Sequence, residues 1–329
     1  LERETGVLLP PTLIFQHSTA GAIAAHLHAK LATTPLEQQD SDHVAADGTD
    51  HRPRDASAVH VASMAACWPS GASSEHELTR LAEAAYDAVG EVPTRRWVVA
   101  AGASHPAVRY AAWVAGAELF DYARYAISPT EAAWMDPQQR LLLENGYAAL
   151  HGAGHGRASL LARDTAVVVG TQAGDFTFMT MQAPAASLPV FAMSGASSSV
   201  ASGRLSFVLG MQGACFSTDT ACSSALVATH AAAQMVRNAE CEEALALAAN
   251  LMLLPRVHML LANAGMTSAD GRCKFLDARA NGYVRGAGAG AALLEPDRAA
   301  PPPARSHRSP RYHAAPCGGH CPAAPPALQ

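Results

Sequence analysis

Continuous apolar runs alternate with segments of helical periodicity from residue 57 to residue 296. Such short runs are typical of strands that are buried on both faces of a sheet. The expected strands are, in chain order, AVHVASMA (58–65), DTAVVVGTQ (164–172), ACFSTDTA (214–221), EEALALAANLML (242–253) and GYVRGAGAGAALLE (282–295). Strands that alternate with helices predict an α/β fold, with a mostly parallel sheet covered on both faces.

Between these strands, apolar residues recur at three- and four-residue spacing, which predicts helices. The clearest example is MDPQQRLLLENGYAAL (135–150), with Asp136 as N-cap and Pro137 at the first helical position. Another helix is expected to end at Gly210, because glycine is favoured just after a helix C-terminus. The expected helices are 73–89, 135–150, 197–210 and 222 to about 237.

The residues before and after this region lack its alternation of strand-like and helix-like patterns. Residues 1–31 have helical periodicity with Ser18 or Thr19 as an N-cap, which predicts a short all-α unit. Residues 32–56 combine many turn formers with almost no periodicity, so we expect a linker. Residues 297–329 are rich in Pro and Ala, and we expect this tail to be disordered. The α/β domain is therefore expected to span 57–296.

Composition argues against several classes of protein. The 329 residues carry a net charge of −5 and no run of Lys or Arg, which disfavours nucleic-acid and membrane-surface partners. The longest apolar run, 244–254, is interrupted by Asn250 and is shorter than the ~20 residues that span a bilayer. The opening LERETG resembles neither a signal peptide nor a natural start. Seven irregularly spaced cysteines form no disulfide framework, so we expect a reducing, cytoplasmic location.

Cys222 lies where an expected strand passes directly into an expected helix, in STDTACSSALVATH (217–230). This position places it in the first helical turn, where free N–H groups and the helix dipole favour a thiolate. Small neighbours leave room for a substrate carbonyl, and the N–H of Cys222 can point at a developing oxyanion. From these residues alone, a nucleophile and a buried core thiol are equally good interpretations.

The segment DTACSSAL (219–226) resembles the active-site segment of the β-ketoacyl synthases, specifically the ketosynthase domain of modular type I polyketide synthases. Three longer segments resemble the same family in order and spacing: ISPTEAAWMDPQQRLLLE (127–144), ASGRLSFVLGMQGACFSTDTACSSALVATH (201–230) and MTSADGRCKFLDARANGYVRGAGAGAALLE (266–295). The resemblance implies the N-terminal half of a thiolase-like fold over 57–296, with a mixed five-stranded sheet and helices on both faces. Residues 1–31 resemble the C-terminal end of an acyl carrier protein domain.

By this resemblance, Cys222 is the nucleophile that takes an acyl chain from a carrier's pantetheine thiol. The family then joins that chain to a carrier-bound malonyl-type extender by decarboxylative Claisen condensation. Asp219, Thr220, Ala221 and Ser223 are implied to form the active-site turn and to support the oxyanion. Acyl carrier protein domains and a second ketosynthase copy are the implied partners. No metal or directly bound cofactor is implied, and no phosphopantetheine attachment site is expected within this chain.

The sequence departs from the family pattern in several places. Ala225 stands where the family usually has serine, and Ala287 where an acidic residue is usual. The family also uses two histidines in HGTGT-like and NIGH-like motifs, and neither motif is found here. The histidines after Cys222 are His230, His258, His307, His313 and His320. We therefore expect this chain to lack the second half of the fold and full condensation activity.

Two other functional interpretations stay open. The first is a non-catalytic ketosynthase-like scaffold or dimerisation partner. The second is an unrelated cysteine hydrolase, which ranks last because no GxSxG-like segment is present. Among weaker candidate sites, GAGAG (286–290) fits close strand packing better than a phosphate loop. A zinc set of His313, Cys317, His320 and Cys321 is disfavoured because no folded scaffold is expected around it.

Overall fold

The computed structural model describes residues 58–94, 96–97, 109–172 and 174–297, the backbone of 311–314, and two short pieces near the N-terminus. The chain divides into two compact units, 1–52 and 53–329. In the first unit, the described residues 24–26 and 28–29 are helical. The expected caps at Ser18 and Thr19 and the expected linker over 32–56 lie outside the described residues.

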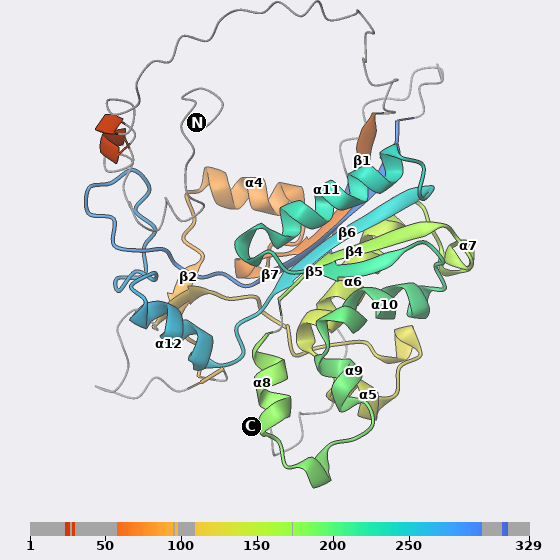
Figure 1. Ribbon diagram of the computed structural model, residues 1–329, viewed down its shortest axis with the longest axis horizontal. Coiled ribbons are helices and arrows are strands. Elements are labelled where there is room, and N and C mark those ends of the chain that lie inside the picture. The colour runs from red at the N-terminus through yellow and green to blue at the C-terminus, as the bar shows by residue number, and fades with distance from the viewer. Residues whose placement is uncertain are drawn as a thin grey trace, which may run out of the picture. The chain divides into compact units, whose positions relative to one another are not determined.

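The second unit is built around one six-stranded sheet, in the order β5-β4-β6-β7-β1-β8 (Figure 1). A separate pair, β2 and β3, forms a small antiparallel sheet. The strands are β1 (Val59–Cys67), β2 (Val89–Glu91), β3 (Tyr110–Ala112), β4 (Thr165–Gly170), β5 (Cys215–Thr218), β6 (Glu243–Asn250), β7 (Gly288–Pro296) and β8 (Arg311–Ala314).

Strand direction confirms a mixed sheet. Strands β5, β4 and β6 are parallel, whereas β7 lies antiparallel between β6 and β1. Because β1 and β8 run in the same direction as β6, the expected mostly parallel sheet is confirmed, with β7 as the antiparallel strand among those described. Apolar residues on both faces of a buried strand indicate burial but carry no information on direction.

The sheet has six strands, not the five expected, because β8 pairs in parallel with β1. Residues 311–314 lie within the tail over 297–329 that was expected to be disordered, so that expectation is wrong for these four residues. Their backbone satisfies donors and acceptors that an edge strand such as β1 would otherwise leave unpaired.

Nine α-helices and four 3-10 turns are found in the described part of the second unit. The helices are α4 (Glu75–Glu83), α5 (Pro129–Ala133), α6 (Pro137–Gly152), α7 (Arg157–Leu160), α8 (Asp175–Gln182), α9 (Ala192–Ala196), α10 (Ser198–Leu209), α11 (Ser224–Arg237) and α12 (Pro255–Asn263). The 3-10 turns are η1 (Pro69–Gly71), η3 (Ala123–Tyr125), η4 (Ala185–Ser187) and η5 (Ala221–Ser223).

The expected helix boundaries are confirmed where a cap was visible in the sequence. The Asp136 carboxylate accepts the N–H of Gln138 at 2.8 Å, and Pro137 begins α6. Helix α10 is followed by Gly210 at φ 74°, a left-handed conformation that favours glycine. The helix expected over 73–89 ends earlier, at Glu83, because β2 begins at Val89.

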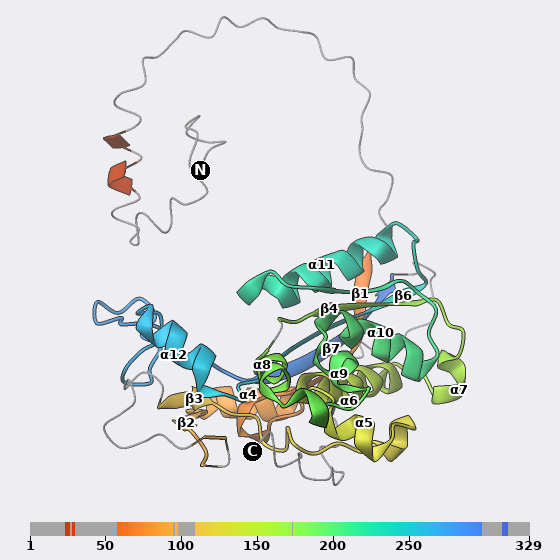
Figure 2. The ribbon, with the colours of Figure 1, turned by 60° about the horizontal axis from the view of Figure 1, so that its bottom comes forward.

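Helices cover both faces of the sheet, as Figure 2 shows, with α11 on one side and α6 and α10 on the other. Alternate residues of β4 point in opposite directions, as a period of two requires. Ala166 and Val168 pack in the cluster with α11, while Val167 and Val169 pack in the larger cluster with α6 and α10. This three-layer arrangement confirms the expected covering of both faces.

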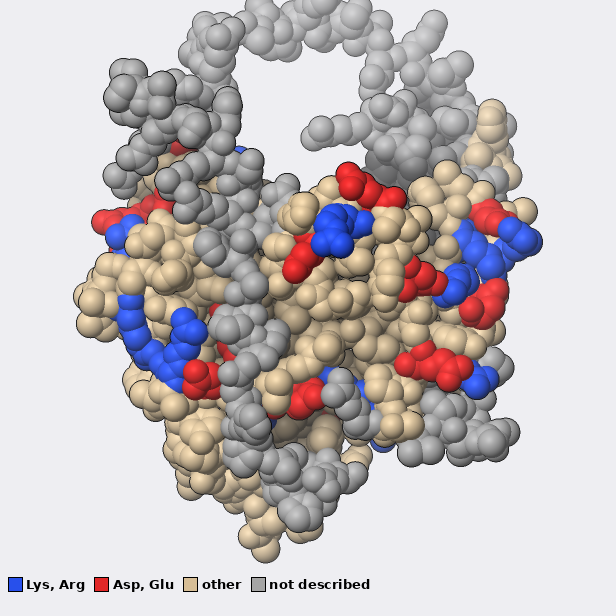
Figure 3. Space-filling model, turned by 180° about the vertical axis from the view of Figure 1, so that it is seen from behind, with Lys and Arg blue, Asp and Glu red and all other residues tan. Residues whose placement is uncertain are grey.

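The described surface carries interspersed charges. On the face shown in Figure 3, Lys and Arg side chains alternate with Asp and Glu, and no broad area of one sign is formed. No helix in the described part of the chain is long and apolar enough to cross a membrane.

Candidate active site

Cys222 is an exposed thiol in the turn η5, between the end of β5 and the start of α11. The interpretation as a buried core thiol is therefore wrong. The expected placement in the first turn of the helix also needs correction, because the α-helix begins two residues later, at Ser224. Ala221 enters the turn at φ 56°, and its N–H is accepted by the Asp219 carboxylate at 3.0 Å, which breaks helical geometry just before Cys222.

Hydrogen bonds on both sides of Cys222 hold the turn. The N–H of Thr220 donates to Ser224 Oγ at 2.9 Å, and the Ser224 hydroxyl donates to the carbonyl of Ala221 at 2.8 Å. The Ser223 hydroxyl is within donating distance of the Thr220 carbonyl and Oγ1, at 2.8 and 2.9 Å. The turn thus has its own polar network, and the thiol does not take part in it.

The backbone N–H of Cys222 has no acceptor among the described residues. An unused N–H beside an exposed nucleophile is the geometry that an oxyanion donor needs. The thiol and this N–H together can serve acyl transfer.

Two contacts fix the turn to the rest of the domain. Gly170, the last residue of β4, lies directly against the backbone of Ser224 at the start of α11. On β5, the Ser217 hydroxyl donates to the Ser198 carbonyl at 2.7 Å and lies 3.2 Å from Ser202 Oγ, so β5 is tied to α10. Cys222 is therefore presented at the carboxyl ends of parallel strands, where α/β proteins commonly place their sites.

No described histidine is hydrogen-bonded to Cys222. His230 is exposed on α11, and His258 is buried on α12 with neither ring nitrogen hydrogen-bonded. Burial, and then the positive charge of Arg285, lower the pKa of His258 to about 4, so its ring is neutral at pH 7. The side chains of His307, His313 and His320 lie outside the described residues, as does the rest of the candidate zinc set.

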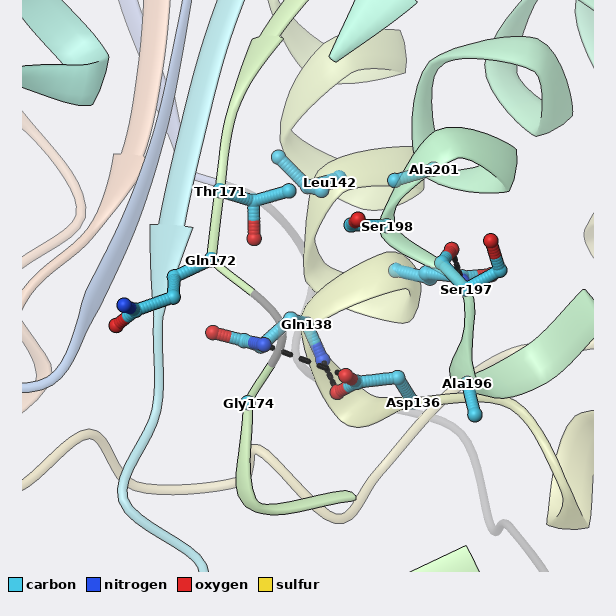
Figure 4. Close-up of a pocket in the computed structure, with 11 residues that line it drawn as sticks. Asp136, Gln138, Leu142, Thr171, Gln172, Gly174, Ala196, Ser197, Ser198 and Ala201 are labelled. Atoms are coloured by element: carbon cyan, nitrogen blue, oxygen red, sulfur yellow. Dashed lines mark hydrogen bonds between the residues drawn. The ribbon is translucent and has the colours of Figure 1, made fainter. Parts of the chain in front are cut away.

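A buried polar network that the sequence reasoning missed lies near the end of β4. Figure 4 shows Asp136 and Gln138 side by side at a cavity of about 10 Å³, room for one water molecule at most. Burial raises the pKa of Asp136 to about 6, and the negative charge of Asp175 raises it further. The hydrogen bonds from Gln138 act in the opposite direction and lower this pKa, but they do not outweigh burial. Gln138 Oε1 accepts the N–H of Leu251 at 3.1 Å, which links α6 to the segment after β6.

Asp175, at the start of α8, supports the same segment. Its Oδ2 accepts the N–H groups of Leu253 and Leu254 at 2.8 and 2.9 Å. A carboxylate a few residues beyond a buried strand was the signal in the sequence that could have indicated this role. The expectation that the glycines of GAGAG serve close strand packing is wrong, because a Cβ added at Gly286, Gly288 or Gly290 would lie 3.7–3.8 Å from its nearest neighbour, an ordinary contact. Gly288 and Gly290 lie within β7, between two neighbouring strands.

Comparison with known proteins bears directly on this site. A family model described as "Beta-ketoacyl synthase, N-terminal domain" matches residues 56–300. The spectinabilin polyketide synthase system protein NorA' of Streptomyces orinoci is 38% identical over 90% of this chain, and erythronolide synthase EryA2 of Saccharopolyspora erythraea is 33% identical over 90%. The chain spans only 8% of the length of each of these relatives.

Solved structures agree with the family model. The ketosynthase from module 6 of the bacillaene synthase of Bacillus subtilis 168 has a TM-score of 0.64 and 32% identity, covering 72% of this chain and 40% of that one. The oxazolomycin ketosynthase domain OzmH KS7 of Streptomyces albus JA3453 has a TM-score of 0.63 and 28% identity, covering 73% and 43%. These matches support the thiolase-like ketosynthase fold. The chain belongs to the beta-ketoacyl synthase family, as the N-terminal domain of a ketosynthase of the modular polyketide synthase type.

Proposed function

We propose that Cys222 accepts an acyl chain from a pantetheine thioester, as the first step of ketosynthase chemistry. The observation that carries this proposal is the exposed thiol beside its own unused backbone N–H, in a turn held by Asp219, Thr220 and Ser223. The family membership supports the same reaction class.

The acyl transfer uses only groups of this turn and the incoming thioester. The thiolate sulfur of Cys222 attacks the thioester carbonyl carbon, and the carbonyl oxygen gains negative charge opposite the Cys222 N–H. Collapse of this intermediate breaks the carbon–sulfur bond to pantetheine. The pantetheine sulfur leaves as a thiolate and takes up the proton that Cys222 lost.

Condensation is the second step of the proposal. A carrier-bound malonyl-type extender loses CO₂, and the resulting enolate carbon attacks the acyl group and releases the Cys222 thiolate. That step places negative charge on an oxygen that needs further donors, and loss of one such donor typically slows a reaction by ~100–1000-fold. We expect condensation to require groups that the described residues do not bring to Cys222.

The proposed partners follow from this chemistry. Acyl carrier protein domains would deliver substrates on phosphopantetheine, without a cofactor bound by this chain itself. Residues 1–31 are proposed to be the end of such a carrier domain. A second copy of the ketosynthase is proposed as a dimer partner, because β5 is an edge strand with exposed residues.

Acyl labelling followed by peptide mapping tests the proposal. The chain is incubated with an acyl-pantetheine thioester and digested, and the mass of each cysteine-containing peptide is measured by mass spectrometry. We expect acylation at Cys222 and its loss in Cys222→Ala. The matched control is Cys215→Ala, because Cys215 is also exposed and lies seven residues earlier, on β5, outside the turn.

Equal labelling of Cys215 and Cys222 would show that the turn confers no reactivity beyond exposure. Absence of acylation in a folded chain would instead favour a non-catalytic scaffold.

A further inference from the structure

We propose that His155, Glu243 and Glu295 form a binding site for a divalent transition-metal cation, with zinc as the best match, at the end of the sheet opposite Cys222. Glu243 begins β6 and pairs in register with Thr165, the first residue of β4. Glu295 lies near the end of β7, which runs the other way. Cys222 instead follows β5, whose last residue pairs with the last residue of β4. The site is therefore independent of the acyl-transfer proposal.

The three side chains converge. One ligand atom from each lies within 4.8 Å of the other two. Nε2 of His155 is 3.2 Å from Oε2 of Glu243, yet this nitrogen is shielded from solvent and makes no hydrogen bond. Ligands at zinc distances of 2.0–2.2 Å lie roughly 3.3–3.6 Å apart around a tetrahedral ion. The 3.2 Å between His155 Nε2 and Glu243 Oε2 is thus close to the separation of two neighbouring ligand atoms bound to one zinc ion.

Glu243 is held firmly for such a role. Its side chain is 1% exposed, and Arg163 donates from Nε to Oε1 at 2.7 Å and from Nη2 to Oε2 at 2.8 Å. The Thr165 hydroxyl donates to Oε1 at 2.6 Å. Oε1 therefore uses both lone pairs, while Oε2 accepts one hydrogen bond and keeps one lone pair on the side of His155. Arg163 and Thr165 act as positioning residues that orient a ligand carboxylate.

Local charge also favours a cation. Arg163 is the only Lys or Arg paired with Glu243 among the described residues, and it faces the negative charges of Glu242, Glu243 and Glu295. The side chain of Glu295 is 32% exposed, which gives an ion a path from solvent. His60 pairs with Glu295 across the strands at 3.9 Å and is not a member of the three-residue group. Water would complete the coordination, as at zinc sites with three protein ligands.

Zinc titration of the whole chain tests the site. To remove competing ligands in the tail, the background carries Cys317→Ser, His320→Ala and Cys321→Ser. Calorimetry at pH 7 should give one zinc per chain in this background. His155→Phe and Glu295→Gln should each weaken binding by at least tenfold, whereas His230→Gln, on the exposed face of α11, should leave it unchanged.

Cobalt provides a second readout. A site of one imidazole and two carboxylates should give weak visible bands without the intense near-ultraviolet absorption of thiolate ligands. Glu295 is partly exposed, so Glu295→Gln is expected to fold and still tests the site if His155→Phe fails to fold. Zinc binding unchanged in Glu295→Gln, thiolate absorption with cobalt, or no stoichiometric zinc in the folded background would each overturn the proposal.

Discussion

Gly170 and Ser224 approach so closely that a Cβ on Gly170 would lie 2.5 Å from the Ser224 carbonyl oxygen. No flexible side chain can give way there, because the contact is with backbone. Gly170→Ala is therefore expected to displace the start of α11 from β4 and to move the Cys222 turn with it. We expect at least a tenfold slower acylation of Cys222, measured by mass spectrometry over time.

Gly203→Ala is the matched control for this variant. Gly203 lies inside α10, and nothing lies within 4 Å of a Cβ added there. Alanine should stabilise the helix by roughly 0.5–1 kcal/mol and leave acylation unchanged. If Gly170→Ala acylates as fast as Gly203→Ala, the contact between β4 and α11 does not position the turn.

His258→Phe is expected to stabilise the domain and to reduce its sensitivity to acid. The folded state keeps His258 neutral, with a pKa of about 4 against 6.5 for the free side chain. The unfolded chain therefore binds an extra proton between these values, so stability is lost as the pH falls from 6.5 towards 4. Phenylalanine removes this proton uptake and the two unpartnered nitrogens, worth about 1–3 kcal/mol at neutral pH.

Thermal melts at pH 7.5 and 5 check this prediction. When the pH is lowered from 7.5 to 5, the melting temperature of the wild type should fall by more than that of His258→Phe. The exposed His230→Gln should follow the wild type. A phenylalanine variant that is less stable at pH 7.5 would show that the ring nitrogens of His258 contribute a favourable interaction.

Asp136→Asn is expected to change the pH dependence in the opposite sense. The folded-state pKa of Asp136 is about 6, above the ordinary 3.8, so the folded state holds a proton that the unfolded chain releases. This contribution is present below about pH 4 and is lost as the pH rises to 6. Asparagine keeps an N-cap oxygen without titrating.

Urea unfolding at pH 4 and pH 7 measures the effect of Asp136→Asn. The free energy of unfolding of the variant, relative to the wild type, should rise by about 2 kcal/mol from the lower to the higher pH. A constant difference would show that Asp136 is ionised throughout in the folded state.

Phe216→Lys is expected to reduce self-association. Strand β5 is at the edge of the sheet, and Phe216 on it is 41% exposed. Unpaired backbone groups beside an exposed aromatic ring favour pairing with a second copy, and a lysine on an edge strand opposes it. Light scattering after size exclusion should show a lower mean mass than for the wild type.

Phe275→Lys separates this effect from general solubility. Phe275 is 89% exposed, but it lies in the loop between α12 and β7 and belongs to no strand. An equal decrease in mass for Phe216→Lys and Phe275→Lys would contradict an interface at β5.

Local patterns in the sequence predicted those parts of the fold that depend on neighbouring residues. Asp136 and Pro137 marked the start of α6, and Gly210 marked the end of α10, because caps are decided within one or two turns of helix. The position of Cys222 between a strand and a helix was likewise visible in the sequence. The left-handed Ala221 that moves the helix start to Ser224 was not, because alanine rarely adopts that conformation.

Local sequence patterns could not predict the contacts between segments that are far apart in the chain. The cluster of His155, Glu243 and Glu295 forms only when the loop between α6 and α7 meets the start of β6 and the end of β7. The antiparallel direction of β7 depends on the route of the chain before it. Gln138 was read as part of a family segment, but its bond to Leu251 requires the tertiary fold.

The position of β7 has a consequence for how the domain folds. Val59, at the start of β1, pairs with Pro296, at the end of β7, and β7 also joins β1 to β6. During synthesis, β1 is the first strand to emerge, but its two neighbours in the sheet, β7 and β8, emerge last, so β1 cannot enter the sheet before β7 is available. Pairing over such a sequence separation slows folding and leaves an apolar strand accessible to other chains. Ribosome-bound intermediates should keep β1 unpaired until residues 288–296 have left the exit tunnel.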